Sequence, residues 1–193
     1  MIFTLWKARQ AQRRKAESLY RAVMTQTRRP EFYVNGGIAD TFEGRFDLLV
    51  VHVALVLFRL KGEGEAGKAV GQQMFDLFFA DMDAALREMG VGDTSVGKRV
   101  REMSEAFYGR LESYDGGLSA DETDRLRMAV ERNLYGAQDN TENAPQAAAM
   151  AVYMRAAADH MKCMSLDGLG AEGLFPDPPA FGAAQGRPME GLS

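Results

Sequence analysis

The chain has few of the residues on which covalent, metal-based or acid–base chemistry depends. It contains one cysteine and two histidines among 193 residues. One cysteine forms no internal disulfide, and so small a supply of ligands excludes a structural zinc site. The sequence has no Gly-x-Ser-x-Gly elbow, no P-loop and no His-Glu-x-x-His motif. We therefore expect no metal, no cofactor and no catalytic residues, which argues against most classes of enzyme.

The sequence also lacks a long apolar run. The longest, from Leu48 to Phe58, is interrupted by His52. A helix that crosses a bilayer needs about 20 apolar residues, so this run predicts a buried helix instead. At the N-terminus the apolar residues precede the charged ones, which is the reverse of a secretory signal. These features imply no export, and we expect a cytoplasmic protein.

Positive charge is concentrated near the N-terminus. The whole chain has a net charge of −4, yet residues 7–29 carry +7, which leaves about −11 for the rest. A basic arm on an acidic body indicates an anionic partner such as RNA, a ribosome or a lipid surface, whereas DNA is not expected. A solvated helix face is the alternative. The candidate contacts are Lys7, Arg9, Arg13, Arg14 and Lys15.

The apolar periodicity predicts an all-α protein, a single compact helical domain of about six helices with no strand. The expected helices are 3–27, 41–61, 66–89, 93–115, 119–135 and 143–164. The first is basic, and Arg9 and Arg13 interrupt its apolar stripe, so we expect its N-terminal half to be loosely attached.

Turn and capping residues predict where the helices and the domain end. Gly116 and Gly117 are expected to end the fourth helix, and Ser119 with Glu122 to cap the fifth. The chain from Gly168 onward holds six glycines and four of the six prolines. We therefore expect a basic arm over 1–19, a helical domain over 20–165 and a flexible Gly/Pro-rich tail over 166–193.

Two local motifs with catalytic or nucleotide-binding meaning are weak. Residues 62–67 match the dinucleotide fingerprint Gly-x-Gly-x-x-Gly, but no strand precedes them, so an interhelical loop is favoured. His160 and Cys163 could form a base–nucleophile pair on one helix, but no orienting partner is visible.

A polar stripe runs along the otherwise apolar helix at 41–61. Arg45, His52 and Arg59 are spaced by seven residues, so they share one side of the helix. The favoured interpretation is that they pair with acidic residues of neighbouring helices. The alternative is a polar edge beside a groove for another protein. Twelve methionines are also present, and methionine adapts to varied apolar surfaces.

Several blocks of sequence, densest between residues 32 and 115, identify a family resemblance. They are Phe32–Tyr33 to Asp40–Thr41, Gly44–Leu48, His52, Met82–Asp83, Arg87–Asp93, Ala106–Arg110 and Tyr114–Asp115. In this order and spacing the chain resembles the ubiquinol–cytochrome c chaperone family. The resemblance implies an all-helical, non-enzymatic assembly factor for the cytochrome bc complex. Because only 19 residues precede Tyr20, the chain is similar to compact bacterial members.

The resemblance also implies partners. Mitochondrial members hold newly made cytochrome b, work near the ribosomal exit tunnel and pair with a small partner protein, which bacterial members need not require. We expect nascent cytochrome b as the client, and a location peripheral to the inner membrane. The candidate client-binding residues are Phe32, Tyr33, Arg45, His52, Met74, Phe78 and Met82. The rival functions are an RNA- or ribosome-binding adaptor that uses the basic helix, and a small enzyme.

Overall fold

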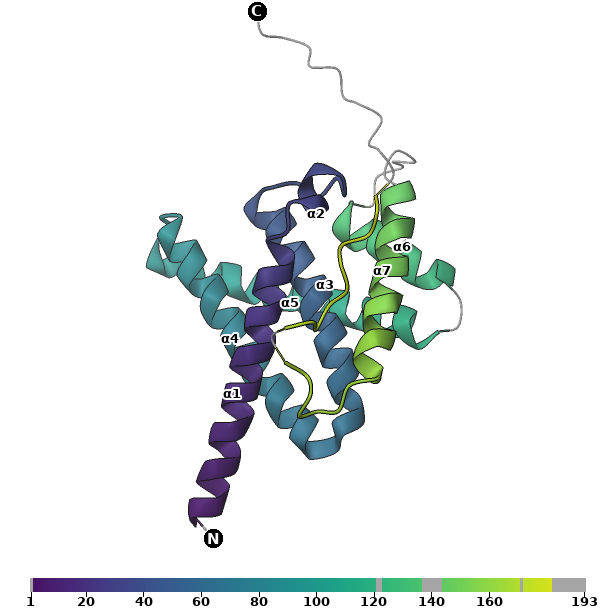
Figure 1. The fold of residues 1–193 in the computed structure, drawn as a ribbon. Coiled ribbons are helices and arrows are strands. Elements are labelled where there is room, and N and C mark those ends of the chain that lie inside the picture. Colours follow the sequence, from purple (N-terminus) through teal and green to yellow (C-terminus); the bar gives the residue numbers. More distant parts are fainter. Residues whose placement is uncertain (1, 121–122, 137–143, 171, 182–193) are drawn as a thin grey trace, which may run out of the picture.

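The structure, a computed structural model, describes residues 2–120, 123–136, 144–170 and 172–181 and is helical throughout its regular elements (Figure 1). The elements are α1 (Ile2–Thr27), α2 (Glu31–Val34), α3 (Phe42–Leu60), a 3₁₀ turn (Lys61–Glu63), α4 (Gly64–Glu88), α5 (Asp93–Ser119), α6 (Thr123–Leu134) and α7 (Ala144–Lys162). No strand occurs in the described ranges. The prediction of an all-α fold with six long helices is confirmed.

Helix α3 lies at the centre, as its apolar run predicts. The Thr41 hydroxyl begins the helix by accepting a hydrogen bond from the Gly44 amide at 3.2 Å. Eleven of the helix's residues are buried, and α1, α4, α5, α6 and α7 all pack against it. A helix that is apolar nearly all round has no side to leave in water, so the other helices surround it.

Helix α1 is buried along its second half. Ala16, Leu19 and Val23 are fully buried and face α3 and α4, whereas the described side chains from Trp6 to Ala11 are exposed. The N-terminal end extends beyond the other helices in Figure 1. The expected difference between the two halves of this helix therefore agrees with the structure.

The predicted boundary between the fourth and fifth helices is wrong. Helix α5 continues through Gly116 and Gly117 to Ser119, so Ser119 ends a helix and does not cap the next one. A Cβ atom at Gly117 would lie 2.8 Å from the Leu126 Cα, so this glycine serves the close approach of α5 and α6. The predicted partner Glu122 and the predicted start at Asn143 lie outside the described residues.

The flexible tail expected from residue 166 does not begin there. The strap, our name for residues 166–170 and 172–181, passes between α1 and α7 in Figure 1. Its Leu169, Leu174 and Phe181 are buried in the common core. These side chains form an apolar surface that the Gly/Pro-rich composition of the segment does not indicate. The rest of the expected tail, 182–193, lies outside the described residues.

Candidate functional site

An apolar groove of about 670 Å³ opens between the end of α1, the short α2, the start of α3 and the second half of α4. We call it the α2 groove. Its lining residues are Met24, Thr27, Arg28, Pro30, Tyr33, Val34, Asp40, Phe42, Arg45, Phe46, Leu49, Met82 and Ala85. Nine of these thirteen residues are apolar or aromatic. A soluble chain rarely leaves such a concave apolar surface without a ligand or partner.

The walls of the α2 groove are held by local polar contacts. The Tyr33 hydroxyl donates to the Thr27 carbonyl at 2.6 Å, which fixes a half-buried ring in the wall. The Arg45 guanidinium donates to the Asp40 carboxylate at 2.6 Å and holds the pKa of that carboxyl below its usual value. Val34, at the rim, is 72% exposed. The groove is therefore preformed, with an apolar rim open to solvent.

A smaller cleft continues this apolar surface around the first turns of α3. It has a volume of about 260 Å³ and shares Phe42 and Phe46 with the α2 groove. Its other wall comes from α5 and includes Arg99, Met103 and Arg110. One continuous surface therefore runs from α2, over the start of α3, to α5.

A largely buried ion pair joins α3 to α5 at this cleft. The Arg110 guanidinium lies 2.8 Å from the Asp47 carboxylate and 5.7 Å from the Phe46 ring centre. Burial raises the pKa of Asp47 to about 6, although the neighbouring Arg110 acts in the opposite direction. Asp47 and Arg110 belong to two separate blocks of the family resemblance, and the pair brings these blocks together. In the sequence, the only signal of this pair is that one block carries a negative charge and the other a positive charge.

The structure separates the seven predicted client-binding residues into two groups. Tyr33, Arg45 and Met82 line the α2 groove. The other four, Phe32, His52, Met74 and Phe78, have no exposed surface. The prediction that these four contact a client directly is therefore corrected, because each side chain faces the core formed around α3.

His52 joins three helices through a buried polar network. Its Nδ1 is 2.9 Å from the Leu48 carbonyl, which can only accept, so Nδ1 carries the proton. Its Nε2 then accepts from the Tyr153 hydroxyl at 2.9 Å, and the Gln26 amide donates to the same hydroxyl oxygen at 2.9 Å. Burial lowers the pKa of His52 to about 4, so the ring is neutral at physiological pH. His52 is therefore structural.

The predicted polar stripe divides into three different environments. Arg45 pairs with Asp40 at the surface, and His52 is buried. Arg59 forms an ion pair with Glu63 at 2.5 Å and donates to the carbonyls of Met161, in α7, and of Met164, just beyond it. Pairing with acidic residues is thus correct for the two arginines, but each partner is close in sequence and does not come from a neighbouring helix.

The basic residues of α1 also have different roles. Arg9, Arg13 and Arg14 line a shallow depression of about 760 Å³ between α1 and α4. Arg13 pairs with Glu17 at 2.9 Å. The Lys15 ammonium donates to the strap carbonyls of Asp167 at 2.9 Å and Leu169 at 2.6 Å, so it holds the strap.

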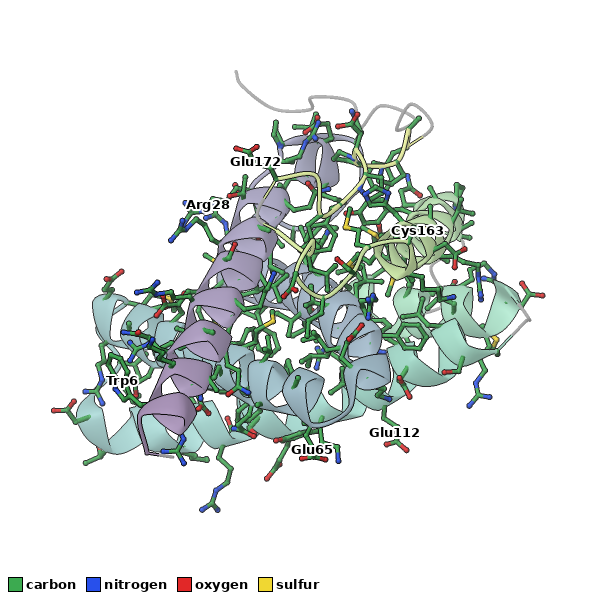
Figure 2. All side chains as sticks on the ribbon, turned by 60° about the horizontal axis from the view of Figure 1, so that its bottom comes forward. Trp6, Arg28, Glu65, Glu112, Cys163 and Glu172 are labelled. Atoms are coloured by element: carbon green, nitrogen blue, oxygen red, sulfur yellow. The ribbon has the colours of Figure 1, made fainter. Side chains whose placement is uncertain are left out.

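The residues considered for chemistry do not assemble a reactive site. The His160 Nε2 lies 2.8 Å from the Gly173 carbonyl, and the exposed Cys163 thiol donates to the Asp159 carbonyl at 3.5 Å, so neither is directed at the other. Figure 2 shows the labelled Cys163 at the end of its helix. Within the described ranges, no three His, Cys, Asp or Glu side chains cluster as metal ligands. Of the helices described, none is both long and apolar enough to cross a membrane.

Comparison with known proteins decides the family. The sequence profile described as "Ubiquinol-cytochrome C chaperone" matches residues 35–175, which include seven of the thirteen residues that line the α2 groove and the first part of the strap. The chain belongs to this family. The predicted resemblance is therefore confirmed.

Individual relatives agree with this membership. The ubiquinol-cytochrome-c reductase complex assembly factor 1 of Xenopus laevis is 29% identical over 137 residues, covering 70% of this chain and 66% of the relative. The Mus musculus protein of the same name is 26% identical over 163 residues, covering 84% of this chain and 53% of the relative. The chain thus spans about half to two thirds of these relatives. The crystal structure of the Cbp3 homolog from Brucella abortus is similar with a TM-score of 0.76 and 32% identity, over 92% of this chain and 97% of that one.

Proposed function

We propose that this family member is a non-enzymatic assembly factor of the cytochrome bc complex that binds newly made cytochrome b until the complex assembles. The family and the names of its relatives, assembly factors of ubiquinol-cytochrome c reductase, support the first part. The α2 groove carries the second part, because it is a preformed apolar surface open to solvent. We infer that the groove covers an apolar helix of the client.

The chemistry of the groove fits this task. Burying apolar area contributes about 25 cal/mol per Å², so a shallow groove can hold an apolar helix reversibly. Met24 and Met82 have flexible side chains that adjust to different client surfaces. Arg28 places positive charge at the edge, next to the apolar wall, whereas the charge of Arg45 is paired with Asp40.

Photo-crosslinking tests whether the groove contacts the client. A crosslinking residue at Val34, 72% exposed at the groove rim, should capture cytochrome b in cells that are making the complex. The matched control is Val152, which is 62% exposed on α7 and does not line the groove. Equal capture from both positions, or capture from Val152 alone, would refute groove binding without affecting the family assignment.

We further propose that the N-terminal half of α1 brings the protein to the anionic inner-membrane surface. The exposed Arg9 and Arg14 supply positive charge on the N-terminal half of α1, beside α4. Each basic residue near an anionic bilayer contributes about 1 kcal/mol, and this attraction weakens as salt rises. An anionic ribosome surface would attract the same residues, so the test uses vesicles alone.

Neutralising these two charges should weaken binding to vesicles. We expect Arg9→Gln with Arg14→Gln to lower sedimentation with phosphatidylglycerol vesicles by about tenfold or more at low salt. The control is Arg101→Gln with Arg125→Gln, which removes the same charge from exposed positions on α5 and α6. If both double variants bind alike, or if salt does not matter, the membrane proposal fails.

A further inference from the structure

The strap lies in a channel lined by side chains of α1, α2, α3 and α7. Its Phe175 ring packs edge-on against His52, with ring centres 5.1 Å apart. Its Phe181 ring meets Phe32 at 6.2 Å, beside Gly36, where an added Cβ would lie 2.9 Å from the Phe181 ring. The strap between these rings contains three prolines and no helix or strand. It is a segment without regular secondary structure, with bends at 172–175 and a tight turn in which the Phe181 amide donates to the Pro179 carbonyl.

The helices hold the strap mainly through its main-chain carbonyls. Lys15 donates to two carbonyls in 166–170, and within 172–181 the His160 ring is hydrogen-bonded to the Gly173 carbonyl. The Gln26 amide donates to the Pro176 carbonyl at 2.9 Å. In the described part of the chain, no backbone amide of 172–180 donates to the backbone of a helix. Contacts to carbonyls do not depend on side-chain identity, so the channel would accept other non-helical segments with apolar side chains at similar places.

The buried polar side chains beneath the strap keep most of their hydrogen bonds when the strap leaves. Gln26, Tyr153 and His52 are hydrogen-bonded to one another beneath it, so removal of the strap breaks only the Gln26 bond to Pro176 within this network. The ion pair between Arg29 and Asp177 of the strap, at 2.7 Å, involves a carboxylate that is 88% exposed. Exposed ion pairs contribute little, and a segment without regular structure opens more readily than packed helices.

We propose that this channel is a binding site for a non-helical, proline-containing apolar peptide, and that residues 172–181 occupy it as the chain's own displaceable ligand. The ligand class follows from the segment seated there, which carries apolar anchors at Leu174, Phe175 and Phe181 around the prolines. The partner is an unfolded protein segment of this chemistry. The site lies apart from the α2 groove, since none of the channel residues Gln26, His52 and Tyr153 lines that groove.

A peptide-binding assay tests the proposal. The probe is a labelled synthetic peptide with the sequence of residues 172–181, and binding is followed by fluorescence anisotropy to full-length protein. In Leu174→Asp the strap loses its buried anchor, so the channel is free for a larger fraction of the time. We expect this variant to bind the probe at least about tenfold more tightly than the wild type, because apparent affinity scales with the competent fraction. Ala180→Ser, an exposed position on the strap, is the control and should bind as the wild type does.

A second measurement tests release of the strap without a destabilising charge. In a Cys163→Ser background, the thiol of Leu174→Cys should react with a thiol reagent at least about a hundredfold faster than that of Val56→Cys, buried in α3, because strap opening needs no global unfolding. Equal labelling rates, a Leu174→Asp protein that is unfolded, or a folded one that binds the probe no better than the wild type would each overturn the proposal. None of these readouts involves cytochrome b, so the proposed function is tested separately.

Discussion

Val34→Asp should lower the amount of mature cytochrome bc complex at least about tenfold while the protein itself remains folded. The side chain is 72% exposed in the free protein, so an aspartate there costs little folding free energy. When an apolar client helix covers the groove, the same carboxylate loses its water without gaining a partner. That penalty is several kcal/mol, and about 1.4 kcal/mol suffices for a tenfold loss of affinity.

The control for this prediction is Val152→Asp. It makes the same chemical change at a valine that is 62% exposed on α7, away from the groove. Both proteins should melt within a few degrees of the wild type, and only Val34→Asp should lose cytochrome b in a pull-down. Normal complex levels with Val34→Asp, or an equal loss with Val152→Asp, would show that the α2 groove is not the client surface.

The helices were predictable because most of their signals are local. The apolar run from Leu48 to Phe58 predicts a central helix, and α3 is that helix. Local signals failed where a residue serves a distant neighbour. Gly117 suggests a helix end in sequence, but its function is to let Leu126 approach, and Leu126 lies on the following helix. Glycine as a helix end and glycine as a packing contact look the same in one sequence.

The groove was only partly predictable, for a related reason. Phe32 and Tyr33 are adjacent in the same block of the resemblance, yet Phe32 is fully buried and Tyr33 lines the groove. On helices that are apolar on several sides, periodicity does not show which side stays uncovered. Met74, Phe78 and Met82 share one stripe of α4, and only Met82 is far enough along the helix to reach the groove.

The strap shows the limit of composition. Glycine and proline predict little regular structure, and the strap has none. Regular structure and burial are separate properties, however. Leu169, Leu174 and Phe181 are far enough apart that no periodic pattern links them, and their burial depends on a channel built from α1, α3 and α7. Only the assembled helices reveal that surface.

His52→Asp should destabilise the protein far more than His52→Leu. The side chain has no exposed surface, so aspartate would bury an unpaired carboxylate next to the Leu48 carbonyl, at a cost of about 3–5 kcal/mol. Leucine removes the acceptor of the Tyr153 hydroxyl, which costs about 1–3 kcal/mol. Urea unfolding measures both. If the two variants have the same stability, His52 is not the buried structural residue described here.

The pH dependence of stability in the wild type and in His52→Leu shows whether His52 causes the loss of stability in acid. Because burial lowers the pKa of His52 from 6.5 to about 4, the unfolded chain binds this proton first as the solution is acidified. The stabilising effect of the neutral ring is complete above pH 6.5 and is lost as the pH falls towards 4, by at most about 3 kcal/mol.

Other groups, such as Asp47 with its raised pKa, titrate in the same range. The difference in unfolding free energy between the wild type and His52→Leu reports on the histidine alone, and we expect this difference to shrink as the pH falls. A wild-type slope in His52→Leu would mean that the charge on another group causes the loss of stability in acid.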